Sequence, residues 1–385
     1  MKVLLIGQLP KEVGGNFTTG IAKVVYELSK QQCEGIDYVV YGTNIKHSKA
    51  KIIKGKSVYY GYRFLVGRIV KNILSNPIKT LKEWNTYKKV NVNPLRYEFY
   101  KANFQRIIEQ AQPDVIHMNG NGLEPLYFAN SKRIPIVKTC HGVFNRKTNP
   151  RSSESLYADY LTGLTQETKY EISHYLCVTD DSRVNIIPNG VDTSKFFYSE
   201  EERKGIRSNL GVAENTKVLI TVASVQERKG QLSFIKILER LACDCQYWII
   251  GQGTDVPLIK EFITDHHLEN KVRLIGYVNS DELYKYYSAA DIYVHASTME
   301  GQALCEIEAF STGLSIFVNN KIQGTIAKEE LKSGDYYFCD FKSPEYNKIT
   351  EWIKTRPLMA RKSRDVLDWK NVANQYAKLY KAIVR

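Results

Sequence analysis

Short apolar runs alternate with segments of helical periodicity along the first half of the chain. Between residues 20 and 30, four apolar residues recur at the spacing of one helix face, namely Ile21, Val24, Val25 and Leu28. The strand candidates around them are KVLLIG (2–7), IDYVVY (36–41), DVIHMN (114–119), IPIVKTC (134–140) and HYLCV (174–178). Strands that alternate with helical segments predict a parallel sheet with crossover helices.

A second series of the same kind begins near residue 217. Its strand candidates are KVLITVA (217–223), QYWIIG (246–251), VRLIG (272–276), DIYVHA (291–296) and LSIFV (314–318). A helical segment, KGQLSFIKILERLA (229–242), follows the first of them. Each series therefore predicts one doubly wound, Rossmann-like α/β unit.

The chain length supports this division, because 385 residues exceed what one ordinary core accommodates. The turn-rich segment 187–196 contains Pro188-Asn189-Gly190 and predicts the boundary. We expect an N-terminal domain at 1–190 and a C-terminal domain at 191–367. A ligand site is expected in the cleft between them, at the carboxyl ends of the strands. The last helix, about 368–385, has no strand of its own, so we expect it to pack back on the first domain.

The composition is that of a globular protein, with 43% hydrophobic and 25% charged residues. Seven cysteines, an odd number, indicate free thiols in a reducing compartment. Cys243-Asp-Cys245 lacks the spacing of a zinc site. The apolar run at the N-terminus is too short for a signal peptide, and nowhere do about 18 apolar residues run together. We therefore expect an intracellular protein without a membrane span.

Positive charge is concentrated in one part of the chain. The segment 46–106 holds 15 Lys and Arg against two acids, Glu83 and Glu98, a surplus equal to the formal net charge of +13. Apolar residues near helical spacing interleave with cations there: Phe64, Val66, Ile69, Val70, Ile73 and Leu74 with Arg63, Arg68 and Lys71. This pattern suits a helix lying in an anionic membrane surface. A solvated basic face, or a single-strand nucleic-acid site, would interleave similarly; no nucleic-acid module is recognisable, so we expect no nucleic-acid partner.

Candidate chemistry lies in STMEGQALCEIEAFSTG (297–313), which predicts a loop that runs into a helix near Ala303. The first N–H groups of such a helix lack acceptors and can hold a pyrophosphate. Glu308 lies one turn beyond Leu304, and helical side chains lean toward the helix N-terminus, so its carboxylate can approach the same ligand. Carboxylates bind vicinal hydroxyls, as in dinucleotide folds. With Glu300 before the helix, the predicted ligand is a diphosphate with hydroxyl groups on both sides, as in a nucleotide-sugar.

These residues resemble the signature of the family 4 glycosyltransferases, retaining enzymes of the GT-B fold with a group 1 type C-terminal domain. Glu300 and Glu308, within EGQALCEIEAF, are similar to the paired glutamates of that family. Further matches follow in the same order along nearly the whole chain: Pro10 with Gly14-Gly15, PDVIHMNG (113–120), TCHGVF (139–144), IPNGVD (187–192), Lys229-Gly230, Gly251 with Gly253, and Ala290-Asp291.

The resemblance implies a role for each matching residue. Glu300 would bind the transferred sugar, Lys229 would neutralise the phosphate as the glycosyl bond breaks, and His141 would contact the donor sugar. Glu308 would bind the ribose hydroxyls. The remaining implied donor-binding residues are Gly14, Gly15, Arg228, Gly251, Gly301, Gln302, Ala303 and Leu304, with the N–H groups of 301–304 on the pyrophosphate. No Asp-x-Asp triplet occurs in the chain, so we expect neither a metal nor another cofactor.

The chain also departs from the family pattern. The usual arginine five residues before the lysine is Ser224, and Arg228 is its candidate substitute. The usual Phe-Gly after the first glutamate and glycine is Gln302-Ala303. Between 178 and 187 the chain is short, so we expect a helix to be missing there. Glu306 is expected to be a solvated first-turn acid, and His117 to be structural.

The resemblance implies retaining transfer from a nucleotide-sugar, for which we expect UDP as the nucleotide. The acceptor hydroxyl would attack from the leaving-group face, and the departing phosphate oxygen would take its proton; a double displacement with Glu300 as nucleophile is the rival mechanism. A UDP-sugar epimerase or phosphorylase, or a non-catalytic binding protein, is the alternative function. The sequence does not indicate the donor sugar, the linkage or the oligomeric state.

The first domain of this fold generally meets the acceptor. Membrane affinity of segment 46–106 then predicts a lipid-linked saccharide acceptor in capsule, exopolysaccharide, O-antigen or lipopolysaccharide assembly. We expect a cytoplasmic protein held peripherally on the inner face of the cell membrane. Soluble, teichoic-acid and protein acceptors are the alternatives.

Overall fold

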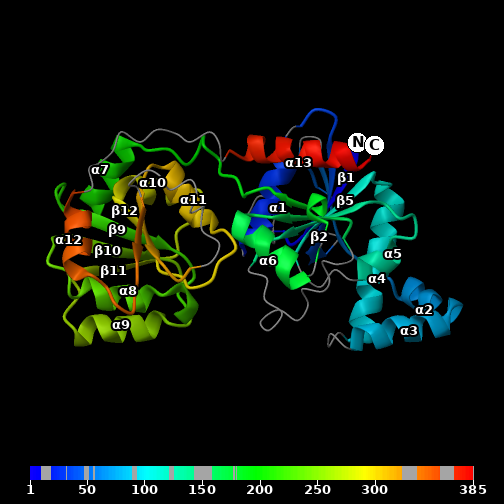
Figure 1. Ribbon diagram of the computed structural model, residues 1–385, viewed down its shortest axis with the longest axis horizontal. Coiled ribbons are helices and arrows are strands. Elements are labelled where there is room, and N and C mark those ends of the chain that lie inside the picture. The colour runs from blue at the N-terminus through cyan, green and yellow to red at the C-terminus, as the bar shows by residue number, and fades with distance from the viewer. Residues whose placement is uncertain are drawn as a thin grey trace. The chain divides into compact units, whose positions relative to one another are not determined.

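The computed structural model forms two compact units, Met1–Asn189 with Trp369–Arg385 and Gly190–Asp368 (Figure 1). Each unit is a sheet of parallel strands covered by helices, so the predicted fold class is confirmed. The structure describes residues 1–9, 19–31, 33–46, 52–54, 57–88, 93–120, 125–142, 158–176, 178, 180–322, 336–355 and 368–384.

The first unit is built on an eight-stranded sheet in the order β3-β4-β2-β1-β5-β6-β7-β8. Its pairs are parallel except β3 with β4. The strands are β1 (Lys2–Gly7), β2 (Asp37–Lys46), β3 (Ile52–Lys54), β4 (Ser57–Tyr62), β5 (Val115–Asn119), β6 (Ile136–Cys140), β7 (Tyr160–Gly163) and β8 (Val184–Ile186). The α-helices are α1 (Gly20–Lys30), α2 (Val66–Ser75), α3 (Pro77–Lys88), α4 (Pro94–Ala111), α5 (Pro125–Ala129), α6 (Gln166–Leu176) and α13 (Trp369–Ile383).

The C-terminal helix α13 packs on the first unit through a buried polar network. His117, on β5, has Nδ1 2.6 Å from the Tyr380 hydroxyl and Nε2 2.7 Å from Thr139 Oγ1. The Tyr376 hydroxyl lies 2.9 Å from the same Thr139 oxygen. Burial and the neighbouring His141 lower the pKa of His117 to about 3, so the ring is neutral at pH 7. His117 therefore links the sheet to α13, as a structural residue does.

One expectation for the end of the first unit was wrong. HYLCV is not a strand, because 174–176 complete helix α6. The described residues between 178 and 187 hold only a 3₁₀ turn (Asp181–Arg183) and β8, without an α-helix. The strand comes earlier, as YLTG in β7, and β8 then leads to the boundary. The Thr165 hydroxyl accepts from the Thr168 backbone N–H at 3.1 Å, which satisfies a free donor at the start of α6. A short apolar run at a helix end has the same hydrophobic pattern as a strand.

The second unit holds a six-stranded parallel sheet in the order β11-β10-β9-β12-β13-β14. Its strands are β9 (Lys217–Val222), β10 (Cys245–Ile250), β11 (Val272–Gly276), β12 (Ile292–His295), β13 (Ser315–Asn319) and β14 (Tyr336–Cys339). Its α-helices are α7 (Glu200–Asn209), α8 (Gln231–Leu238), α9 (Val256–Asp265), α10 (Leu283–Ala289), α11 (Leu304–Ser311) and α12 (Tyr346–Thr355). A short 3₁₀ turn, η4 (Glu227–Lys229), precedes α8.

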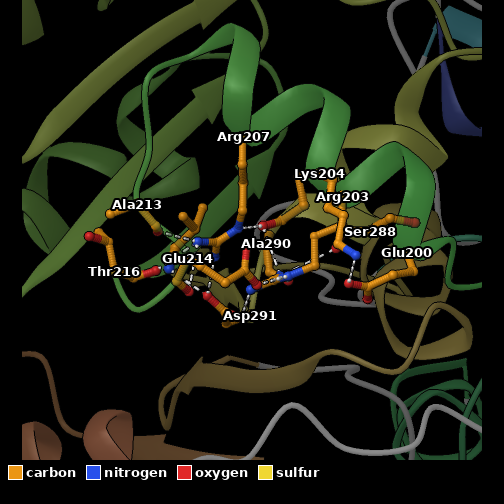
Figure 2. A network of polar contacts seen from close by, with 12 residues as sticks. Glu200, Arg203, Lys204, Arg207, Ala213, Glu214, Thr216, Ser288, Ala290 and Asp291 are labelled. Atoms are coloured by element: carbon orange, nitrogen blue, oxygen red, sulfur yellow. Dashed lines mark hydrogen bonds and ion pairs between the residues drawn. The ribbon is translucent and has the colours of Figure 1, made fainter.

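Two buried arginines of α7 fix the start of β12 (Figure 2). Arg207 donates to Asp291 Oδ2 at 2.8 Å and Arg203 to Asp291 Oδ1 at 3.1 Å. Both also donate to the backbone oxygen of Ala289, at the end of α10. Asp291 Oδ2 in turn accepts from the backbone N–H of Val218, on β9, at 2.7 Å. This network fixes the starts of β9 and β12, which are neighbours in the sheet and both lead to the candidate site.

Candidate functional site

The candidate site lies where β9, β10 and β12 end, because parallel neighbours present their carboxyl ends at one edge of the sheet. Close backbone contacts bring their loops together. Gly251 has φ +142°, and a Cβ there would lie 1.9 Å from the oxygen of Ala223. Gly230 has φ +71°, and a Cβ there would lie 2.3 Å from the oxygen of Ala296. Only glycine permits both approaches.

Helix α11 begins at this edge, at Leu304, with Ala303 as its N-cap residue. Ala303 has no side chain that could cap the helix. The first N–H groups of a helix lack acceptors within the helix and can bind an anion. Gly301 and Gln302, which lead into the helix, are buried. The predicted start of this helix near Ala303 is thus what the structure has.

Three charged side chains meet just before α11. Lys229 Nζ forms a short ion pair with Glu300 Oε1, and Arg228 Nη1 lies 3.2 Å from the same oxygen. The Ser297 hydroxyl is 2.9 Å from Glu300 Oε1 and 3.1 Å from the Arg228 backbone oxygen, which ties the loop to η4. Both neighbouring cations therefore reach one carboxylate, although adjacent loop residues need not point the same way.

The charge of Glu300 is stabilised by these contacts. Burial by itself would raise the pKa of Glu300, but the ion pair with Lys229, the charge of His295 and the Ser297 hydroxyl outweigh it, and the pKa lies below its ordinary value. Arg228 remains half exposed, whereas Lys229 is largely covered. The cluster thus joins a fixed anion to two cations, of which Arg228 is the more accessible to a ligand.

Glu308 lies one turn into α11 and is buried. The hydroxyl of Tyr287, a buried residue of α10, donates to Glu308 Oε2 at 3.3 Å. A phenol is a weaker partner than the cations that hold Glu300, and it positions the carboxylate without neutralising it. Glu308 is therefore placed as an acceptor close to the amino end of the helix.

Glu306 was expected to be solvated, and that expectation was wrong. Its side chain is fully buried, and Glu306 Oε2 lies 2.7 Å from Nδ1 of His295, the last residue of β12. The histidine across the strand–helix junction lies at ion-pair distance, but neither Glu306 oxygen nor His295 Nδ1 has a hydrogen-bond partner in the described part of the chain. Glu306 thus lies beside the end of β12, held by proximity of charge and not by a hydrogen bond.

One predicted site residue of the first unit lies in the described part of the chain: His141, just beyond β6. Its Nε2 lies 2.8 Å from Oδ1 of Asn119, at the end of β5, while the buried Nδ2 of Asn119 has no partner in the described part of the chain. Burial, with the nearby charge of Lys138, lowers the pKa of His141 to about 4, so the ring is neutral at pH 7. Gly14 and Gly15 lie outside the described residues.

Some residues of the site were missed from sequence. Ser297 stands just after a buried strand, the position where polar side chains often serve a site, and that signal was available. Tyr287 and His295 carried no usable signal, because both lie in apolar runs of core type. Across the described residues, no group of three or more His, Cys, Asp or Glu is arranged to hold a metal.

Comparison with known proteins gives two family models that match consecutive parts of the chain. "Glycosyltransferase Family 4" matches residues 18–195, and "Glycosyl transferases group 1" matches residues 202–364. The first match lies almost wholly in the first unit, and the second lies within the second unit.

Named relatives are more distant. The α-monoglucosyldiacylglycerol synthase of Acholeplasma laidlawii is 24% identical over 63% of this chain and 67% of its own length. The UDP-Gal:α-D-GlcNAc-diphosphoundecaprenol α-1,3-galactosyltransferase of Escherichia coli is 27% identical over 56% of this chain and 60% of its own. The alignments thus span about three fifths to two thirds of these relatives. Among solved structures, Anabaena HepE in complex with UDP matches at a TM-score of 0.71 with 16% identity, covering 99% of this chain and 100% of that one.

Proposed function

The chain belongs to the family 4 glycosyltransferases, and on that premise we propose that it transfers a sugar, with retention of configuration, from a UDP-sugar to a membrane-associated, lipid-linked saccharide. The enzyme class and the GT-B fold follow from the family matches and from the structural likeness. The donor, the acceptor and the pathway, which we propose is the assembly of a cell-surface polysaccharide, are the parts to be tested.

One observation carries the proposal: helix α11 starts at Ala303, which has no capping side chain, with Glu308 one turn inside the helix and Glu300, held by Lys229 and Arg228, just before it. The helix N–H groups and the two cations suit a diphosphate. The two carboxylates suit hydroxyl groups, since a carboxylate repels phosphate and accepts from a diol. We assign Glu308 to the ribose and Glu300 to the transferred sugar.

In the proposed reaction, an acceptor hydroxyl attacks the anomeric carbon from the face that the diphosphate leaves. The bond from that carbon to the phosphate oxygen breaks, and the departing oxygen takes the hydroxyl proton. Lys229 stabilises the charge that grows on the phosphate, without participating covalently. Lys229 is paired with Glu300, so it has to leave that carboxylate, at least in part, to reach the phosphate of a bound donor. Arg228 contacts the same carboxylate and can keep its charge neutralised. No metal is required in this scheme.

We propose that His141 contacts the donor sugar as a neutral ring. Its lowered pKa leaves it uncharged at pH 7, so it would act through a hydrogen bond. With Asn119 Oδ1 accepting from Nε2–H, Nδ1 is left as an acceptor for a sugar hydroxyl. The assignment of Gly14, Gly15, Gly251 and residues 301–304 to the donor also remains a proposal.

The choice of acceptor is supported by the relatives and by the charge of the first unit. One relative is named for a diacylglycerol product and another for a diphosphoundecaprenol acceptor. Segment 46–106 carries 15 basic residues, which favours an anionic membrane surface as a further partner. The proposed location is the inner face of the cell membrane.

A donor and acceptor screen tests the proposal. Thermal stabilisation by UDP-, GDP- and ADP-sugars identifies the donor, and transfer to a polyprenyl-diphosphate-linked sugar is then followed with and without EDTA. We expect a UDP-sugar to stabilise the protein and an α-linked product to form from an α-linked donor in both conditions. Epimerisation without transfer, or an inverted product, would contradict the proposed reaction.

A further inference from the structure

Helix α2 turns an apolar stripe toward solvent. Val66, Val70 and Leu74 follow one another at intervals of four residues and are 67%, 47% and 72% exposed. Phe64, just before the helix, is 70% exposed, and α3 continues the surface with Ile78 and Leu81. An amphipathic helix normally buries such a stripe in its own core. We call these six residues the α2–α3 face.

The opposite sides of both helices are fixed to α4. From α2, Arg68 forms an ion pair with Glu109 at 2.9 Å, and Asn72 donates to Gln105 at 3.0 Å. From α3, buried Glu83 accepts from Lys101 at 2.5 Å. Figure 1 shows the two short helices alongside α4. The polar side of α2 thus faces the protein, and its apolar side cannot turn inward.

Glu98, the other acid of segment 46–106, is also buried between α3 and α4. Trp84, on α3, donates from Nε1 to Glu98 at 3.3 Å, and Glu98 is fully buried. Exposed cations lie on the same helices or next to them in the chain: Arg63 before α2, Lys71 on α2, Lys79 and Lys82 on α3, and Arg96 on α4. Glu83 and Glu98 are the two acids of segment 46–106, and both are buried, so this surface is apolar and positive at once.

We propose that the α2–α3 face inserts into an anionic lipid bilayer, with Phe64, Val70 and Leu74 among the acyl chains and the lysines at the phosphates. Ten residues of α2 span about 15 Å, which suits a helix lying in the interface plane. Within the described residues, no helix is long and apolar enough to cross a bilayer. These exposed cations favour anionic lipid, because its phosphate groups can neutralise them where an apolar protein surface could not.

The test is sedimentation of the whole protein with protein-free vesicles of phosphatidylcholine containing phosphatidylglycerol. The test variant is Val70→Glu with Leu74→Glu. Leu258→Glu is the matched control, since Leu258 on α9 of the second unit is 50% exposed. We expect the double variant to bind at least about tenfold more weakly, at low salt and at 0.5 M salt, with the control at the wild-type level. Insertion rests on the membrane partner of the proposed function, but the assay involves no donor, so its failure leaves the proposed sugar transfer standing.

A second variant separates insertion from adsorption by charge. Brominated acyl chains should quench Leu74→Trp more than the wild-type protein with its four native tryptophans, whereas Leu258→Trp should show no quenching beyond wild type. Loss of binding in the double variant, with quenching at position 74, supports the proposal. Unchanged binding by the double variant, absence of quenching at position 74, or a wild-type protein that ignores vesicles but self-associates through this face, would each overturn it. Circular dichroism of each variant confirms folding, and the quenching result stands even if a glutamate variant misfolds.

Discussion

The two units place acids and bases in opposite ways. On the α2–α3 side of the first unit, Glu83 and Glu98 are buried while the cations around them are exposed. At the sheet edge of the second unit, Glu300, Glu306 and Glu308 gather around a helix start, each with a partner of its own. The net charge of the chain therefore describes neither surface.

The partners of each acid indicate whether its role is structural or functional. Glu83 and Glu98 serve packing, because their lysine and tryptophan partners come from neighbouring helices and hold a helix pair in place. Glu300 is bonded to side chains that a phosphate could equally engage. An acid whose partner would also bind a ligand is a better site candidate than one whose partner is confined to the core.

The largest effect should come from the arginine network that supports the sheet edge of the second unit. Arg207→Ala removes the bonds to Asp291 and to the end of α10, leaving buried oxygens unsatisfied. We expect the free energy of unfolding of the second unit to fall by about 3 kcal/mol or more. Lys204→Ala, an exposed residue of the same helix, should change it by less than about 0.5 kcal/mol. Urea unfolding measures both, and a similar small loss in the two variants would contradict the structural role of Arg207.

The next largest effect should be catalytic. Lys229→Ala should lower kcat by about 100- to 1,000-fold, as removal of one electrostatic donor in an active site does. Arg228→Ala should cost less, because Arg228 is half exposed and shares its carboxylate with Lys229. Lys260→Ala, on α9, should have no effect. Steady-state kinetics with the identified donor gives the ranking, and equal losses for Arg228 and Lys229 would show that both cations act on the phosphate.

The smallest effect should be on how the stability of the first unit depends on pH. The folded protein keeps His117 neutral with its pKa near 3, whereas the unfolded chain has the ordinary value of 6.5. The unfolded state therefore binds more protons below pH 6.5, and stability falls as pH falls toward 3. Between pH 7 and pH 5.5 this histidine should account for a loss of about 1 kcal/mol. Between pH 7 and pH 5.5, the free energy of unfolding of His117→Gln should therefore fall by about 1 kcal/mol less than that of the wild type. Urea unfolding at the two pH values measures both losses.

The exposed His174→Gln is the matched control for this experiment, because His174 lies on α6 of the same unit. It should keep the pH dependence of the wild type. A pH dependence that is identical in wild type and His117→Gln would show that the buried ring takes no part in it.

The sequence was sufficient for what depends on local periodicity. Nine of the ten strand candidates lie on strands of the structure, and the start of α11 was placed at Ala303 from the loop and helix pattern. It failed at HYLCV, where a helix end has the pattern of a strand, and it did not anticipate β3, β4, β7, β8 or β14. Whether a given side chain is buried or exposed depends on partners that are distant in the sequence, and local periodicity does not identify those partners.

Glu306 illustrates this limit for the site. From its position in the first turn alone, a solvated acid was the expected state. His295, eleven positions earlier, reverses that by meeting it across the junction of β12 and α11. The pair of Lys229 with Glu300 could be anticipated as two residues of one site, but their direct contact could not.

The most direct test of the central claim is the dissociation constant of UDP, measured by calorimetry on wild type and Glu308→Ala. Tyr287→Phe serves as a control that leaves the carboxylate in place, and Glu306→Gln as a control for the helix start. The account predicts that Glu308→Ala weakens UDP binding by about tenfold or more, the usual magnitude for a hydrogen bond to a charged group, while Tyr287→Phe changes it little. Unchanged affinity in a folded Glu308→Ala protein would contradict the placement of the nucleotide at the amino end of α11.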